Sequence, residues 1–130
     1  MIVADASAVV ELLLGGETAA PVATRLLDPA ETVHVPHLLD VEVAQALRRY
    51  ALSRELDPER GMNALADLGD LPFRRYPHTM LLDRAWELRR SVSAYDAVYI
   101  ALAEALEAPL LTRDRRLARA HGHFARIELI

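Results

Sequence analysis

The chain has 130 residues, of which 52% are hydrophobic and 26% are charged. This length suits one folding unit with its own core, so we expect a single domain over residues 1–130. The absence of cysteine excludes disulfides, thiolate zinc sites and cysteine nucleophiles. The net charge of −4 is mild, and by itself it argues slightly against a nucleic-acid-binding protein.

The N-terminal residues and the apolar runs bear on where the protein works. Met1 to Ala4 has no basic segment before it, so we expect no signal peptide. No apolar run approaches the roughly 20 residues that a membrane helix needs, so we expect a cytoplasmic protein. All 15 basic residues are arginine, which binds phosphate through forked hydrogen bonds. For most of these arginines, the composition of the genome is the preferred explanation.

The first third of the chain alternates between strand and helix patterns. Ile2–Ala4 is a short apolar run, which is typical of a strand buried on both faces. Ala6–Leu14 is predicted to be a helix that stops at two glycines. Thr18–Leu27 is predicted to be a second helix, with a proline tolerated in its first turn. Thr32–Val35 is a predicted strand.

The middle of the chain is predicted to be mainly helical. A long helix is expected from Pro36 to about Ser53. Asp57 then provides an N-cap for a helix that begins at Pro58 and runs to about Leu68. Leu71–Tyr76 is predicted to be an edge strand, because its internal proline would disturb a central one.

The last third continues the alternation. His78–Arg90 has the spacing of an amphipathic helix, and Ser93–Glu107 is so apolar that we expect a buried helix. Pro109–Thr112 is a predicted strand, Asp114–His121 a short helix, and Phe124–Ile130 a final strand. Strands that alternate with helices in this way predict an α/β fold with a parallel sheet.

Four acidic residues are predicted to gather at one edge of this sheet. Asp5 directly follows the first strand, and Asp114 comes just after the strand Pro109–Thr112. Asp96 lies in the first turn of a helix, and Glu42 lies in the second turn of the helix after another strand. Open parallel sheets bind ligands at the carboxyl ends of their strands, where all four acids are expected.

Each acid also has a purely structural explanation. Asp5 and Asp114 are favoured N-cap residues for the helices that follow them. Asp96 can form a capping box with Ser93. Glu42 fits a surface role least well, because no arginine lies three or four residues away on its helix and its neighbours there are mostly apolar.

Together the four carboxylates favour a metal site over four separate caps. Carboxylates at one edge repel one another, and a hard cation such as Mg²⁺ or Mn²⁺ removes that cost. One or two such ions could bind a phosphodiester, lower the pKa of an attacking water and stabilise the leaving oxygen. Ser7 and Thr112 lie close in sequence to Asp5 and Asp114, and their hydroxyls could orient these groups; ordinary turn and cap bonds are the alternative.

The four acidic segments resemble the motifs of PIN domains, in the family's order and over nearly the whole chain. The segments that carry this resemblance are Met1–Ala8, Val35–Val43, Ser93–Tyr99 and Leu111–Leu117. The short chain resembles in particular the VapC toxins of type II toxin–antitoxin pairs. The resemblance implies a three-layer α/β/α fold with a five-stranded parallel sheet. It also implies an Mg²⁺- or Mn²⁺-dependent endoribonuclease that cuts structured RNA, such as transfer or ribosomal RNA.

The resemblance also assigns roles and partners. It implies a VapB-type antitoxin whose tail covers the active site, and usually a homodimer. By motif position, Asp5, Asp96 and Asp114 would hold the metal, and Glu42 would complete its shell or orient the water. Thr112 matches the family's hydroxyl before the fourth acid. Four arginines beside that acid are candidates for RNA contacts, or alternatively form a solvated basic face: Arg113, Arg115, Arg116 and Arg119.

Other functions fit the sequence less well. A phosphate-accepting receiver domain needs a lysine, a dehalogenase-type phosphatase needs a second aspartate where Ser7 stands, and no P-loop motif is present. His121 and His123 raise the possibility of a zinc site, although a surface loop is preferred. A non-catalytic PIN-fold module that binds RNA or protein stays open. The aromatic residues are predicted to pack in the core rather than stack on bases: Tyr50, Phe73, Trp86, Tyr95, Tyr99 and Phe124.

Overall fold

The computed structural model describes all 130 residues and contains one sheet of five parallel strands. The strands lie in the order β3-β2-β1-β4-β5, and every neighbouring pair is parallel. The predicted parallel sheet is therefore confirmed. The strands are β1 (Ile2–Ala4), β2 (Val33–Pro36), β3 (Arg74–Tyr76), β4 (Leu110–Thr112) and β5 (Ile127–Leu129).

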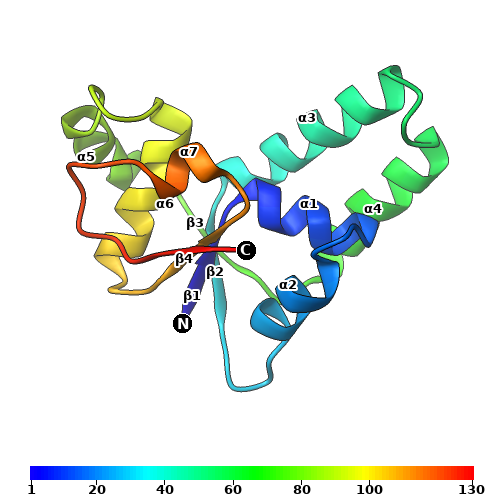
Figure 1. Cartoon of the computed structure of the whole chain (residues 1–130), viewed down its shortest axis with the longest axis horizontal. Helices are drawn as coiled ribbons and strands as arrows, with labels where there is room; N and C mark the ends of the chain where they lie inside the picture. Colours follow the sequence, from blue (N-terminus) through cyan, green and yellow to red (C-terminus); the bar gives the residue numbers. More distant parts are fainter.

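Helices cover both faces of this sheet, which gives the three layers that the resemblance to PIN domains implied. Figure 1 shows α1 to α4 on one side and α5 to α7 on the other, with α3 and α4 projecting together away from the sheet. The helices are α1 (Ala6–Leu14), α2 (Ala19–Leu26), α3 (Leu38–Leu52), α4 (Pro58–Asp70), the 3₁₀ helix η1 (His78–Leu81), α5 (Leu82–Glu87), α6 (Ala94–Ala105) and α7 (Arg115–Ala118).

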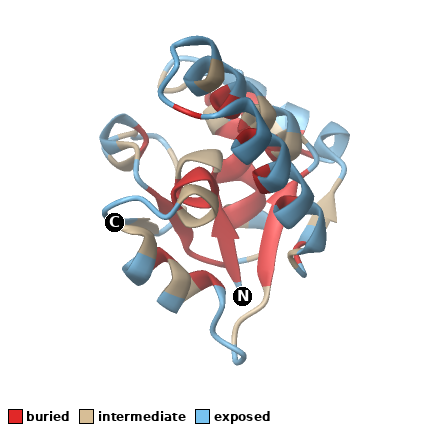
Figure 2. Ribbon diagram, turned by 90° about the vertical axis from the view of Figure 1, so that its right-hand side faces the viewer, coloured by how far each residue is buried: buried red, intermediate tan, exposed pale blue.

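The core lies along the central strand β1 and the helix α6 that packs on it. All three residues of β1 have no exposed surface, as expected for a strand that is covered on both faces. Seven consecutive residues of α6, from Ala97 to Ala103, are also buried. Figure 2 shows the buried colour concentrated in the sheet and in the helix faces that contact it. Burial of this apolar surface is the main force that fixes the carboxyl ends of the strands in place.

Several predicted boundaries were wrong by a few residues, and proline explains two of them. Pro36 ends β2, where it pairs with Tyr76, rather than opening α3, which begins at Leu38. β3 begins only at Arg74, because Pro72 has no amide hydrogen to donate to a ladder. The segment His78–Arg90 starts with η1 and ends early, in a tight turn where the Leu88 amide donates to two carbonyls at 3.2 Å.

None of the helices taken alone combines the length and the apolar composition that spanning a bilayer requires. Taken together, α1 and α2 have the length and apolar composition of a membrane span, but the chain bends by 113° at the break between them. α1 packs against α2, α3, α4 and β4, and it carries buried residues of the core.

Candidate active site

The four predicted acids lie together at the carboxyl end of the sheet. They line one open cavity of about 660 Å³, together with Ser7. β1 pairs with both β2 and β4, so the segments that follow these three strands meet at this edge. α6 packs on the same strands and brings its first turn to the cavity. The four predicted acids that line it are Asp5, Glu42, Asp96 and Asp114, and two further acids, Glu11 and Glu55, line it as well.

Asp5 is the most buried of the four, with 6% of its surface exposed. Its Oδ1 accepts hydrogen bonds from Ser7 Oγ at 2.7 Å and from the Ala8 amide at 3.1 Å, and its Oδ2 accepts one from Thr112 Oγ1 at 2.7 Å. Asp5 is therefore also the N-cap of α1, so the structural explanation holds beside the site geometry. Burial raises the pKa of Asp5, and these hydrogen bonds oppose the rise.

Ser7 and Thr112 link the first and fourth acidic segments. The Arg113 amide donates to Ser7 Oγ at 2.9 Å, and the Asp114 amide donates to Thr112 Oγ1 at 2.9 Å. Thr112 is fully buried beneath the cavity, whereas Ser7 lines it. Each hydroxyl thus donates to Asp5 and accepts from the loop after β4, which fixes that loop against the start of α1. Both hydroxyls lie where the sequence predicted supporting residues.

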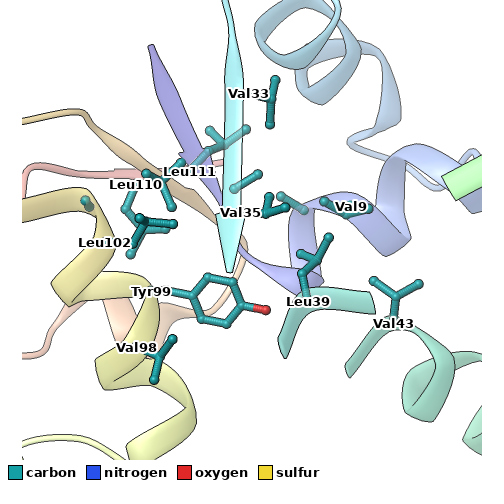
Figure 3. Packing of buried hydrophobic residues seen from close by; sticks show 14 of the residues in the cluster. Val9, Val33, Val35, Leu39, Val43, Val98, Tyr99, Leu102, Leu110 and Leu111 are labelled. Atoms are coloured by element: carbon teal, nitrogen blue, oxygen red, sulfur yellow. The ribbon is translucent and has the colours of Figure 1, made fainter. Parts of the chain in front are cut away.

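Glu42 is held by a phenol that sequence reasoning missed. Tyr99 OH donates to Glu42 Oε1 at 2.6 Å, and Figure 3 shows the Tyr99 ring pointing from α6 toward α3 among buried aliphatic side chains. Burial raises the pKa of Glu42, and the nearby carboxylates of Asp96 and Asp5 raise it further, against the Tyr99 bond. Tyr99 was predicted to pack, which is correct for its ring. Its place three residues after Asp96, on one helix face, was the signal for a site role.

Asp96 lies in the first turn of α6, which Ser93 caps by accepting a hydrogen bond from the Asp96 amide at 3.2 Å. The serine half of the predicted capping box is therefore present. Burial raises the pKa of the Asp96 carboxyl, and the charges of Asp114 and Asp5 raise it further. Asp114 caps α7 through the Arg116 amide at 2.7 Å, so its structural role is also real.

The chemistry of the donors in the cavity fits a hard divalent cation. Its candidate ligands are carboxylate and hydroxyl oxygens, and no histidine or cysteine lines it. Of the four acids, only Asp114 has an arginine within ion-pair distance, at 3.9 Å from Arg116. Burial, and to a lesser degree the charges of neighbouring carboxylates, raise the pKa values of Asp5, Glu42 and Asp96, and a bound cation would offset this cost. No three of the acidic and histidine side chains lie close enough together to form a ligand group for one ion.

The predicted RNA-binding arginines divide into two pairs. Arg113 and Arg116 line the cavity, and Arg113 also forms an ion pair with Glu11 at 3.0 Å. Arg115 and Arg119 are exposed but do not line it.

Three further residues line the far end of the cavity: Arg49, Tyr50 and Arg60. The two arginines were missed as functional candidates, and Tyr50 was considered for base stacking but predicted to pack in the core. Arg49 could have been found, because it lies two helical turns after Glu42.

The other sequence expectations have mixed outcomes. Phe73 and Tyr99 are buried as predicted. The packing prediction was wrong for the other four aromatic residues, since Tyr50, Tyr95, Trp86 and Phe124 are 36%, 61%, 69% and 90% exposed. The His123 side chain forms a hydrogen bond to the backbone, with Nε2 3.0 Å from the Ala120 carbonyl oxygen.

The acid-lined cavity at the carboxyl end of a five-stranded parallel sheet defines an α/β protein with a carboxylate site. The chain belongs to the PIN domain family, which matches residues 2–122. It is 45% identical to Ribonuclease VapC12 of Mycobacterium tuberculosis over 130 residues, covering 100% of this chain and 99% of that protein. It is 47% identical to Ribonuclease VapC1 of the same organism over 129 residues, covering 98% and 96%. In fold it is similar to the crystal structure of VapBC2 from Rickettsia felis bound to a promoter DNA fragment. That match has a TM-score of 0.70 at 16% identity and covers 99% of this chain and 98% of that one.

Proposed function

We propose that this protein is a metal-dependent endoribonuclease and the toxin of a VapBC-type toxin–antitoxin pair. The observation that carries the proposal is the group of four carboxylates that line one cavity, of which only Asp114 has an arginine within ion-pair distance: Asp5, Glu42, Asp96 and Asp114. Relatives that are 45% and 47% identical over nearly their whole length carry the name ribonuclease VapC, which supports RNA as the substrate.

Each acid has a role that its surroundings support. Asp5, Asp96 and Asp114 would hold Mg²⁺ or Mn²⁺ beside the scissile phosphodiester. Such an ion supplies Lewis acidity, because it neutralises phosphate charge and lowers the pKa of water. Glu42 completes the ligand shell or orients the attacking water. Its Oε1 is fixed by Tyr99, and its other oxygen accepts no hydrogen bond from the chain. The raised pKa of Glu42 makes it a better proton acceptor than an ordinary glutamate.

The proposed partners follow from the same assignment. The Rickettsia felis structure is of a VapBC2 complex, and we propose a VapB-type antitoxin for this chain, with a tail that covers the cavity. The protein would act in the cytoplasm on structured RNA, such as transfer or ribosomal RNA, as a homodimer. Residues 1–130 would form one PIN domain.

Cleavage of total bacterial RNA by the purified, antitoxin-free protein tests this function. The assay compares Mg²⁺, Mn²⁺ and EDTA for the wild type, Asp5→Asn and Asp96→Asn. Asp67→Asn is the matched control, because Asp67 is exposed on α4 and forms no ion pair. Loss of residues that merely orient metal ligands costs about 10–100-fold, so each ligand variant should lose more than about 100-fold.

The outcomes separate the two candidate functions. Cleavage that requires the metal and is lost only in Asp5→Asn and Asp96→Asn would establish the nuclease and its site. Cleavage that survives EDTA or both substitutions would refute the site assignment. A folded protein that binds Mn²⁺ and RNA but cuts none would instead support the non-catalytic PIN-fold module.

A further inference from the structure

The cavity extends well beyond the four acids. Its far end lies between α1, α3 and α4 and is lined by Arg49, Tyr50, Glu55, Leu56 and Arg60. A single cavity of about 660 Å³ contains both ends, so a ligand that reaches the acids can continue along it. A phosphodiester at the acids would use only the first part of this space.

Helix α3 forms one wall that connects the two ends. Glu42, Ala46, Arg49 and Tyr50 all line the cavity, and their spacing of four, three and one residues places them along one helix face. Arg49 lies seven residues after Glu42, a rise of about 10 Å along the helix axis. Stacked nucleotides rise about 3.4 Å each along one strand, so this distance corresponds to about three nucleotides.

The far end carries basic groups that the protein itself does not neutralise. Arg49 forms no ion pair or side-chain hydrogen bond within the chain, and it is exposed. Arg60 donates to the Leu14 carbonyl through one nitrogen at 2.7 Å, which leaves its other donors available. Glu55 is the acid at this end, and no arginine pairs with it. The Tyr50 side chain is partly open, with 36% of the residue exposed.

From this arrangement we propose that Arg49, Arg60 and Tyr50 form an RNA subsite for nucleotides that flank the cleaved bond on one side. This inference rests on the proposed function, and it adds which part of the substrate is held and by which residues. The arginines contact phosphates, since guanidinium groups bind phosphate oxygens through forked hydrogen bonds. Tyr50 offers its ring for a base to stack upon, which tolerates any sequence.

Arg48 provides a matched control for Arg49. It is the preceding residue on the same helix, it is equally an arginine, and it is exposed and unpaired, but it does not line the cavity. Substitution of either residue by glutamine removes the same charge from the same helix. Any difference between the two variants therefore reports on the cavity rather than on net charge.

The experiment measures binding of fluorescein-labelled bacterial transfer RNA to uncleaving Asp96→Asn protein at several salt concentrations. Adding Arg49→Gln should weaken binding about three- to tenfold at low salt and reduce the salt slope by about 1. Adding Arg48→Gln should change the binding affinity and the salt slope much less. Tyr50→Ala should weaken binding at least about fivefold, whereas Tyr50→Phe should retain it. Thermal unfolding of each variant confirms that it is folded.

Each other outcome has a definite meaning. If the wild type cleaves RNA but the Arg49 and Arg48 variants bind alike, the subsite is wrong and the proposed function stands. If the wild type cuts no RNA and the Asp96→Asn protein binds none, the proposed function is wrong and the subsite with it. If Arg49→Gln leaves RNA binding intact but weakens binding of a synthetic antitoxin-tail peptide, the occupant is peptide, which overturns the RNA assignment.

Discussion

Helix α6 carries one partly buried acid near each end, and the protein treats the two in opposite ways. Near its C-terminal end, Glu104 accepts two hydrogen bonds from Arg84, at 2.8 Å and 3.0 Å, and one from the Phe124 amide at 2.8 Å. This guanidinium lowers the pKa of Glu104. At the other end, Asp96 has no arginine within ion-pair distance, and burial raises its pKa.

The difference distinguishes an acid that stabilises the fold from an acid that costs stability. Glu104 joins α6 to α5 and to the loop before β5, so its charge is compensated where it is structural. Asp96 shares its cavity with the three other predicted acids. Asp5 and Glu42 accept hydrogen bonds from hydroxyls, and only Asp114 has an arginine within ion-pair distance, at 3.9 Å. Buried acids with raised pKa values and no basic partner are typical of functional sites. This distinction would be wrong if any acid in the cavity were found to stabilise the metal-free protein.

The largest effect is expected from Thr112→Val, which removes a hydroxyl that supports the buried Asp5 carboxylate. The change deletes the 2.7 Å bond to Asp5 Oδ2 and the acceptor for the Asp114 amide, so both acids lose their orientation. We expect Mn²⁺ affinity, measured by calorimetry, and RNA cleavage to fall about 10–100-fold.

Two further substitutions make this prediction specific. Thr112→Ser keeps the hydroxyl and should recover most of the affinity. Thr24→Val, on the exposed side of α2, should leave Mn²⁺ binding unchanged. Unchanged Mn²⁺ affinity in Thr112→Val would mean that the hydroxyl is only a cap for the loop after β4.

Much of this contrast could be predicted from the sequence, because local patterns fix the elements that carry the acids. The apolar run of β1 and the position of Asp5 directly after it place that carboxylate at the end of a central strand. The same reasoning places Asp114 after β4. The long apolar stretch of α6 predicted a buried helix, and the helix is buried over seven consecutive residues. The parallel sheet and the gathering of the acids followed from these features, whereas the three-layer arrangement was implied by the resemblance to PIN domains.

Contacts between distant segments could not be predicted in the same way. The Tyr99 bond to Glu42 joins residues 57 positions apart, and nothing in either local pattern requires it. The far end of the cavity depends on how α4 packs against α1 and α3. Trp86 and Phe124 were predicted to pack, but their exposure depends on where α5 ends and on the path of the loop before β5. These are tertiary outcomes, and hydrophobicity alone does not decide them.

The next largest effect is expected from Glu104→Gln, which should destabilise the protein. The substitution removes the negative charge that Arg84 needs, so Arg84 would remain partly buried without its main partner. We expect a loss of about 1–3 kcal/mol in the free energy of unfolding, measured by urea denaturation at pH 7. Glu107→Gln is the control, because Glu107 is exposed and forms no ion pair.

The stability that Glu104 contributes should depend on pH in a defined direction. The pKa of Glu104 is lower in the folded protein than its ordinary value of 4.5, so the unfolded chain binds more protons in the acid range. The stability that Glu104 provides is therefore complete above about pH 4.5 and is lost as the pH falls through the folded pKa. The deficit of Glu104→Gln should shrink over that range. A deficit that stays constant with pH would show that shape rather than charge is responsible.

The smallest expected effect is an increase in stability, opposite in sign to the effect of Glu104→Gln. Asp96→Asn removes a charge that burial and the charges of Asp114 and Asp5 disfavour, while it keeps the size of the side chain and leaves the Ser93 cap intact. We expect the metal-free variant to melt about 3 °C higher than the wild type at pH 7.5, whereas Asp67→Asn should not. Adding Mn²⁺ should reverse the order, because only the wild type keeps the full ligand set and ligand binding to the folded state raises stability. If Asp96→Asn instead lowered the melting temperature in EDTA, Asp96 would be a structural acid like Glu104. The contrast between the two ends of α6 would then no longer distinguish site from fold.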